Sequence, residues 1–255
     1  SLIHVHELQH GGYLLSDHLL VEKKIPLLCS TWGSDLVLYG KLHSHRDRLA
    51  KLMARTDYLL AERKVDFEIA SNLGFTGKFI YPSYVTIGID RLTFPETLPS
   101  TRRKIVVKGY QDNHGRALNV LQAFTLIAER LKTFEIIVIS ASEPVRIFAE
   151  YMKSEYELDI VCVPKLSRED TLKIFNDSRI YIGLSISDGI SNTMIESMQN
   201  GAFPIQSSNS CASDFIQDGI GGFIVDPWNI PQLASLIERA SFDDALVDAS
   251  VEVNL

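Results

Sequence analysis

Short apolar runs alternate with amphipathic segments along most of the chain. After residue 103, six runs are short, rich in β-branched residues and mostly apolar, as expected for strands buried on both faces. They span residues 104–108, 134–140, 159–163, 180–184, 203–206 and 222–225. Between them, helical periodicity is clearest over 115–132, where apolar residues recur every three or four positions. This alternation predicts a parallel, doubly wound α/β sheet.

The first part of the chain has the same alternation with fewer strands. Strand patterns occupy residues 2–6, 26–30, 58–61 and 78–81, and helical patterns occupy 13–23, 45–55 and 65–72. Residues 88–103 contain two prolines and a polar run, which indicates a linker. We therefore expect a partial first α/β domain over 1–92, a linker over 93–103, a second α/β domain over 104–240, and the start of a helical crossover over 241–255.

Composition narrows the class of protein. The chain is 45% hydrophobic and 22% charged, which is typical of a soluble globular protein. Its net charge of -7 argues against a nucleic-acid partner. The three cysteines form no CxxC pair, which favours a reducing compartment, and no apolar run approaches the roughly 18 residues of a membrane span. We expect a cytoplasmic protein, and we interpret the opening at Ser1 directly before a strand pattern as a cut end.

The segment 185–204 carries the clearest chemical signal. A turn signal at Asp188-Gly189 follows a buried strand, and a helix pattern follows the turn and ends at Asn200-Gly201. Three successive residues that favour helix N-caps start that helix, namely Ser191, Asn192 and Thr193. The carboxyl end of a parallel strand is where open α/β sheets bind ligands, and a helix N-terminus there favours phosphate.

Two acids in this segment lie eight positions apart, and each has an ordinary structural interpretation. Asp188-Gly189 is a common turn, and Glu196 with Thr193 forms the pattern of a capping box, in which the glutamate only satisfies a backbone N–H. Alternatively, the two carboxylates can bind hydroxyl groups on two parts of one ligand. The order of strand, acid, glycine, N-caps, second acid and strand favours the second interpretation.

This order resembles the acid-x7-acid signature of the retaining family-4 glycosyltransferases, the glycosyl transferases group 1. Residues 214–222 are similar to that family's E-x-x-x-D-G-x-x-G, residues 87–90 to its entry into the linker, and residues 31–35 to its H-G-S-D loop. The resemblance covers about residues 2–240. It implies a GT-B-like α/β fold, in which two Rossmann-like doubly wound domains face a cleft, with the first domain here N-terminally truncated.

The resemblance also implies roles for individual residues. Asp188 and Glu196 are the expected catalytic pair, with Asp188 on the donor sugar and Glu196 on the ribose. Lys165 is expected to bind the nucleoside together with Glu196. The expected donor-phosphate residues are Gly109, Tyr110, His114, Arg116, Gly189, Ser191, Asn192 and Thr193. The expected acceptor-side residues are Trp32, Gly33 and Asp35.

Four positions depart from the family pattern. Asp188 replaces a glutamate, Trp32 replaces a loop histidine, Tyr110 stands where arginine is usual, and His114 stands where lysine is usual. Arg116 is the nearest cation with a fixed charge and is expected at the first turn of the helix over 115–132. These changes leave open a catalytically degenerate subunit that only binds the nucleotide-sugar.

The expected function is transfer of a sugar from a nucleoside-diphosphate-sugar to a glycan or a lipid-linked acceptor, with retention of configuration. The resemblance implies no cofactor and no metal, and His4 and His6 lack a third ligand at a metal-like spacing. Residues 41–64 hold seven Lys or Arg against three acids, which is compatible with a peripheral contact at the inner face of the membrane or with a solvated helix.

Two further enzyme classes fit less well. Nucleotide-sugar epimerases also use the GT-B fold, but the spacing of the two acids argues against them. An NAD-dependent oxidoreductase would need a GxGxxG after a strand, which the chain lacks. Because the first domain is expected to be incomplete, we expect this chain to bind a donor and to transfer sugar poorly.

Overall fold

The computed structural model describes residues 1–15, 25–83 and 97–254. The chain divides into two compact units, which are described separately. Unit 1 comprises Ser1–Ile87 together with Ser187–Ile190, and unit 2 comprises Gly88–Ile186 and Ser191–Leu255.

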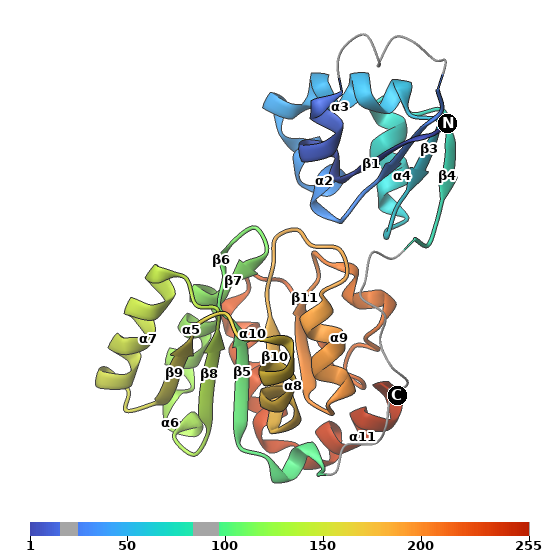
Figure 1. Cartoon of the computed structure of the whole chain (residues 1–255). Coiled ribbons are helices and arrows are strands. Elements are labelled where there is room, and N and C mark those ends of the chain that lie inside the picture. Colours follow the sequence, from blue (N-terminus) through green and yellow to red (C-terminus); the bar gives the residue numbers. More distant parts are fainter. Residues whose placement is uncertain (16–24, 84–96, 255) are drawn as a thin grey trace. The chain divides into compact units, whose positions relative to one another are not determined.

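Unit 1 contains a four-stranded parallel sheet with the order β1-β2-β3-β4 (Figure 1). Its strands are β1 (Ile3–His6), β2 (Leu27–Ser30), β3 (Tyr58–Leu60) and β4 (Lys78–Ile80). Its α-helices are α2 (Ser34–Val37), α3 (His43–Arg55) and α4 (Val65–Asn72), and short single turns occupy Glu7–Gly11, Gly12–Leu14 and Tyr39–Lys41. The core forms where alternate strand residues such as Val5, Leu27 and Leu59 meet the buried side chains of α3.

Unit 2 contains a six-stranded, all-parallel sheet with the order β12-β11-β10-β5-β8-β9. The strands are β5 (Lys104–Lys108), β8 (Glu135–Ile139), β9 (Asp159–Val163), β10 (Ser178–Gly183), β11 (Phe203–Ser207) and β12 (Phe223–Val225). The chain builds outward from β5 to β9 and then returns to the other side of β5 with β10. The strand order therefore reverses between β5 and β10, which is the position where doubly wound sheets bind ligands.

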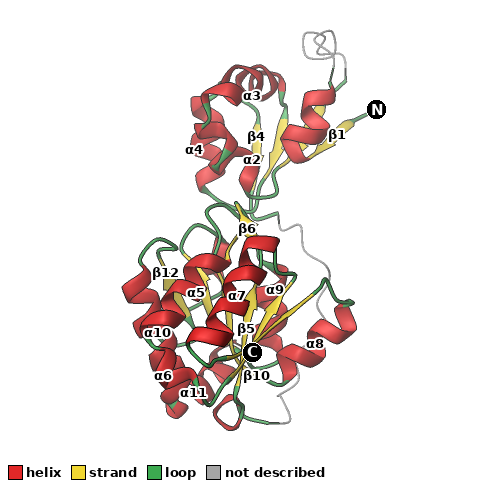
Figure 2. Ribbon diagram, turned by 90° about the vertical axis from the view of Figure 1, so that its left-hand side faces the viewer, coloured by secondary structure: helices red, strands yellow, loops and turns green. Residues whose placement is uncertain are grey.

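Helices cover both faces of this sheet (Figure 2). One core layer lies under α5, α7, α10 and α11, and the other lies under α8 and α9. These helices are α5 (Ala117–Leu126), α6 (Ala128–Leu131), α7 (Glu143–Glu155), α8 (Arg168–Asn176), α9 (Asn192–Gln199), α10 (Ile230–Phe242) and α11 (Asp244–Asn254). A single helical turn at Pro99–Thr101 precedes β5. An antiparallel hairpin of two short strands, β6 (Gln111–Asp112) and β7 (Gly115–Arg116), follows β5.

The predicted strands are confirmed in both units, each within two residues of its expected limits. The prediction of one helix over 115–132 is wrong in two respects. Its first two residues form β7, and the helix breaks at Ile127, where φ is -129°. The predicted helix over 13–23 falls mainly outside the described residues, and so does part of the predicted linker. Within the part of the chain that the structure describes, no helix is long and apolar enough to cross a membrane.

Candidate functional site

The connection from β10 to α9 has the local structure that its sequence predicts. All six residues of β10 are buried, and α9 begins after Ser191, which has the extended backbone of an N-cap. The helix ends at Asn200, and Gly201 follows with a positive φ of 79°. The free N–H groups of the first turn of α9 therefore lie at the carboxyl end of β10.

A chain of hydroxyl groups fixes the start of α9 to the sheet. The Tyr181 hydroxyl lies 2.7 Å from Thr193 Oγ1, which lies 3.1 Å from Ser191 Oγ. Tyr181 is only 1% exposed, although it carries a polar group in a buried strand. Gly183 makes room for this arrangement, because a Cβ there would lie 2.7 Å from the Tyr181 oxygen and 2.4 Å from Gln206 Oε1.

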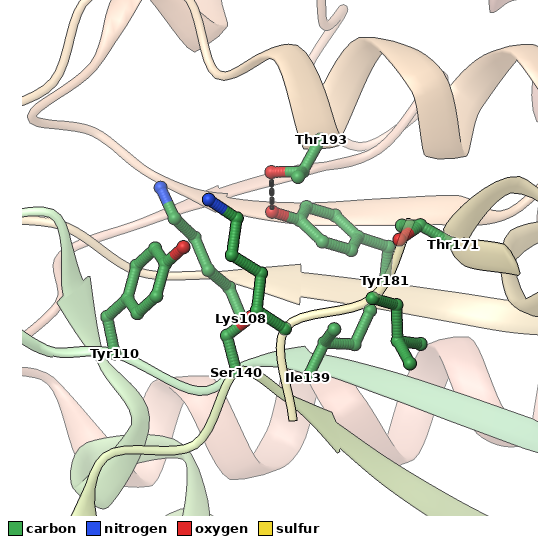
Figure 3. Close-up of a pocket in the computed structure, with 9 residues that line it drawn as sticks. Lys108, Tyr110, Ile139, Ser140, Thr171, Tyr181 and Thr193 are labelled. Carbon is green, nitrogen blue, oxygen red and sulfur yellow. Dashed lines mark hydrogen bonds between the residues drawn. The ribbon is translucent and has the colours of Figure 1, made fainter. Parts of the chain in front are cut away.

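A cavity of about 150 Å³ opens beside these hydroxyl groups (Figure 3). Its lining comes from the strands β5, β8 and β10, the segments that follow β5, β8 and β9, and the first turns of α8 and α9. The lining residues are Lys108, Tyr110, Ile139, Ser140, Lys165, Leu166, Thr171, Tyr181 and Thr193. They bring two ammonium groups and five hydroxyl groups together without a carboxylate. This composition and the adjacent helix N-terminus suit an anionic ligand such as a phosphate ester.

Glu196 lies in the second turn of α9 and is 6% exposed. Its Oε1 accepts a hydrogen bond from Arg168 Nε at 2.8 Å, so the carboxylate is paired across to the first residue of α8. This contact differs from the capping box that the Thr193–Glu196 spacing also allows. Ser167 is the N-cap of α8, because its hydroxyl accepts a hydrogen bond from the Asp170 N–H.

The β6–β7 hairpin carries three of the predicted phosphate residues. Tyr110 lines the cavity, but His114 is exposed at the hairpin turn and its ring lies 3.2 Å from Asn113 Nδ2. Arg116 is the N-cap residue of α5 rather than part of its first turn. Its guanidinium lies 4.9 Å from the centre of the Trp228 ring, and its Nε is buried without a partner in the described part of the chain.

The backbone of this hairpin supports the loop that follows β10. The Arg116 N–H donates to the Leu184 carbonyl, and the Ile186 N–H donates to the Asn113 carbonyl, both at 3.0 Å. Gly109, at the entry to the hairpin, allows close backbone packing, because a Cβ there would lie 2.6 Å from the Ile139 carbonyl oxygen. Two loops far apart in sequence are therefore held together at the carboxyl edge of the sheet.

Asp188 and Gly189 lie in the loop between β10 and α9, in the segment grouped with unit 1. Trp32, Gly33 and Asp35 lie in unit 1, directly after β2. The Asp35 carboxylate accepts the N–H groups of Leu8 and Trp32, both at 2.6 Å, and so joins the loops that follow β1 and β2. Burial raises the pKa of Asp35 above its ordinary value.

Trp32 is 45% exposed and lies edge-on to His6, with ring centres 6.2 Å apart. The His4 and His6 rings lie 3.9 Å apart, and His4 Nε2 is 2.8 Å from Ser30 Oγ. Within the described ranges, no three metal-ligating side chains gather into a cation site. Independence from metal remains a prediction for this chain.

Sequence reasoning placed Tyr110, Lys165 and Thr193 in the site, and the structure brings these three to one cavity. The sequence analysis did not predict five other residues at or beside this cavity, namely Lys108, Ser140, Thr171, Tyr181 and Arg168. One of these had a sequence signal, because Lys108 is a charged residue at the end of an apolar strand, and such residues lie at the ligand-binding edge of a parallel sheet.

Comparison with known proteins identifies the family. Residues 89–250 match the family model of the glycosyl transferases group 1. The chain belongs to this family. Its fold is the GT-B-like α/β fold of these glycosyltransferases. A search among curated proteins gives no match.

Several solved glycosyltransferases have a similar structure. α,α-Trehalose 6-phosphate synthase from Burkholderia multivorans has a TM-score of 0.74 at 17% identity, over 100% of this chain and 67% of that one. Staphylococcus aureus TarM, solved with fondaparinux, α-GlcNAc-glycerol and UDP, has 0.73 at 13% identity, over 92% and 47%. The pneumococcal O-GlcNAc transferase GtfA, solved with UDP and GlcNAc, has 0.71 at 15%, over 99% and 53%. This chain therefore spans about half of the length of the last two.

Proposed function

We propose that this chain binds a nucleoside-diphosphate-sugar in the cavity of unit 2 and supplies the donor side of a sugar transfer. The proposal rests on the cavity beside the N-terminus of α9, where Lys108, Lys165 and Thr193 converge. Family membership supports it, and so does the UDP with which two similar glycosyltransferases, TarM and GtfA, were solved. The donor nucleotide and the sugar stay open.

The chemistry requires that charge on the departing diphosphate be stabilised. The ammonium groups of Lys108 and Lys165 and the free N–H groups at the start of α9 are suited to this task, because they act on the anion as it forms. Arg116 stays a candidate phosphate ligand, and its guanidinium would have to leave the Trp228 ring to take part. In the proposed mechanism, Glu196 accepts the ribose hydroxyls and Asp188 contacts the donor sugar.

We further propose that the transfer proceeds with retention and without a metal, and that the acceptor is a glycan or a lipid-linked sugar. Trp32 offers an exposed aromatic face after β2, and aromatic faces bind sugar rings and other apolar surfaces well. The family resemblance is the support for retention. The structural observations agree equally with a subunit that binds the donor without transferring the sugar, and a turnover assay with nucleotide-sugars separates the two.

A contact with an anionic membrane is proposed for the basic segment over 41–64. In the structure, α3 exposes Arg46 and Lys51, next to Lys41 and the apolar side chain of Leu42. Arg55 does not belong to this surface. It is 3% exposed and pairs with Asp57 at 2.8 Å, so it is excluded from any charge-reversal test.

Calorimetric titration with UDP, GDP, ADP and TDP tests the donor site. We expect at least one of these ligands to bind, and we expect Glu196→Ala to weaken that binding by about 10-fold or more, because a hydrogen bond to a charged group contributes about 1.5–3 kcal/mol. Glu150→Ala, at an exposed position of α7, is the matched control and should bind as the wild type does. If none of the four ligands binds the wild-type chain, the proposed function is wrong.

A further inference from the structure

The ion pair between Arg168 and Glu196 joins two helices that are separate in sequence. Arg168 Nε donates to Glu196 Oε1 at 2.8 Å. The two side chains differ in exposure, since the glutamate is buried and the arginine side chain is 53% exposed. The carboxylate is therefore held in a mostly buried position, while the guanidinium lies at its open edge.

The acids next to Arg168 are engaged elsewhere. Glu169 pairs with Lys173 at 2.9 Å. Asp170 pairs with the same lysine at 3.3 Å and accepts a hydrogen bond from the Ser167 hydroxyl at 2.7 Å. Among the described residues neither acid pairs with Arg168, whose partner is Glu196 on α9. The first turn of α8 thus contributes one cation to Glu196.

The geometry leaves one carboxylate oxygen available. The contact uses Oε1, and within the described residues the structure gives Oε2 of Glu196 no hydrogen-bond partner. A glutamate side chain has three rotatable bonds, so a fixed partner on one oxygen restricts where the other oxygen points. The planar guanidinium is suited to this role, because its Nε–H has a fixed direction that a lysine ammonium lacks.

We infer that Arg168 is a positioning residue, which orients Glu196 so that its second oxygen accepts the ribose hydroxyls of the donor nucleotide. The inference rests on the proposed function, since it assigns the ribose to Glu196. Arg168 acts through Glu196 and needs no contact with the nucleotide. Through this arrangement Arg168 favours nucleotides with ribose hydroxyls over nucleotides without them, although it lies 28 positions from Glu196 in the sequence.

The test compares two ligands in calorimetry, namely the nucleoside diphosphate that binds best and its 2′,3′-dideoxy analogue. We expect wild-type protein to prefer the ribose ligand by about 10- to 100-fold, as one or two charge-assisted hydrogen bonds imply. Arg168→Ala should lower affinity for the ribose ligand by about 10-fold or more and leave affinity for the dideoxy ligand within about threefold. Arg168→Lys should lie between the two.

Arg130 offers a matched control, because its side chain is 59% exposed and its Nε lies 3.0 Å from Oε1 of a glutamate on another helix of unit 2, Glu238. Arg130→Ala should keep the full ribose preference. A purely structural role for Arg168 would weaken both ligands equally, and that result overturns the inference, as does an unchanged preference in Arg168→Ala. Should Arg168→Ala fail to fold, Arg168→Gln and Arg168→Lys carry the same comparison. Absence of any nucleotide binding by wild-type protein would instead reject the proposed function, and the role of Arg168 with it.

Discussion

Asp66 gives unit 1 a stability that depends on pH. It lies in the first turn of α4 and is fully buried. One carboxylate oxygen accepts from the Thr31 hydroxyl at 2.9 Å, and the other is buried without a partner in the described part of the chain. The pKa of Asp66 is raised from 3.8 to about 7, and burial is the main cause. The nearby acids Asp35 and Glu62 add to the rise, whereas the Thr31 hydrogen bond and the charge of Arg63 oppose it.

The sign follows from the protons that each state binds. Between about pH 4 and pH 7 the folded chain keeps a proton on Asp66 that the unfolded chain releases. Stability therefore falls as pH rises through this window, and the loss is complete above the folded pKa. With pKa values of 3.8 and about 7, the free energy of unfolding falls by about 2–3 kcal/mol from pH 5 to pH 8.

Urea unfolding at pH 5, 6.5 and 8 measures this effect. The chain has two tryptophans, Trp32 in unit 1 and Trp228 in unit 2, so a Trp228→Phe background makes fluorescence report on unit 1 alone. In that background Asp66→Asn cannot titrate, and we expect its free energy of unfolding to gain about 2–3 kcal/mol relative to that of Asp66 between pH 5 and pH 8. Equal pH dependence with and without the substitution would refute the reasoning.

Two further predictions concern ligand and membrane contacts. Lys165→Ala should weaken nucleoside diphosphate binding by about 10- to 100-fold in calorimetry, as expected for the loss of one charge-assisted hydrogen bond. Lys153→Ala, at an exposed position, is the control and should bind as the wild type does, and equal affinity of the two variants would remove Lys165 from the site. The wild-type chain should sediment with anionic but not with neutral vesicles. The double substitution Arg46→Glu and Lys51→Glu should abolish this difference, because each basic residue near an anionic surface contributes about 1 kcal/mol to binding. Equal sedimentation of the wild-type chain with both kinds of vesicle contradicts the membrane contact.

The elements of the fold could be predicted because each is encoded locally. The strand over Lys104–Lys108 is an apolar run of the right length, and Ser167 followed by acids encodes the start of α8. The break at Ile127 could not be predicted, since the apolar periodicity continues on both sides of it. Periodicity reports which face is apolar, and it does not show where backbone hydrogen bonding is interrupted.

The site could be predicted only where one segment carries it. The loop and the N-cap before α9 follow from neighbouring residues. The cavity, however, needs β10 beside β5, and in the sequence these two strands are separated by β8, β9 and the helices between them. Tyr181 has an ordinary strand pattern in sequence, and its hydroxyl gains meaning only from Thr193 at 2.7 Å. Arg168 and Glu196 likewise lie 28 positions apart.

The phosphate side of the site shows how a departure from a family pattern can be offset. Tyr110 and His114 stand where the family resemblance leads one to expect arginine and lysine, and they are two of the four departures that leave open a subunit which only binds the donor. In the structure the cavity nevertheless has two cations, Lys108 at the end of β5 and Lys165 after β9. Because an anion responds to the position of a charge and not to its place in the sequence, the replacements alone do not argue against donor binding. Lys165→Ala therefore tests donor binding, which both hypotheses require, and the turnover assay with nucleotide-sugars separates a transferase from a subunit that binds the donor without transferring the sugar.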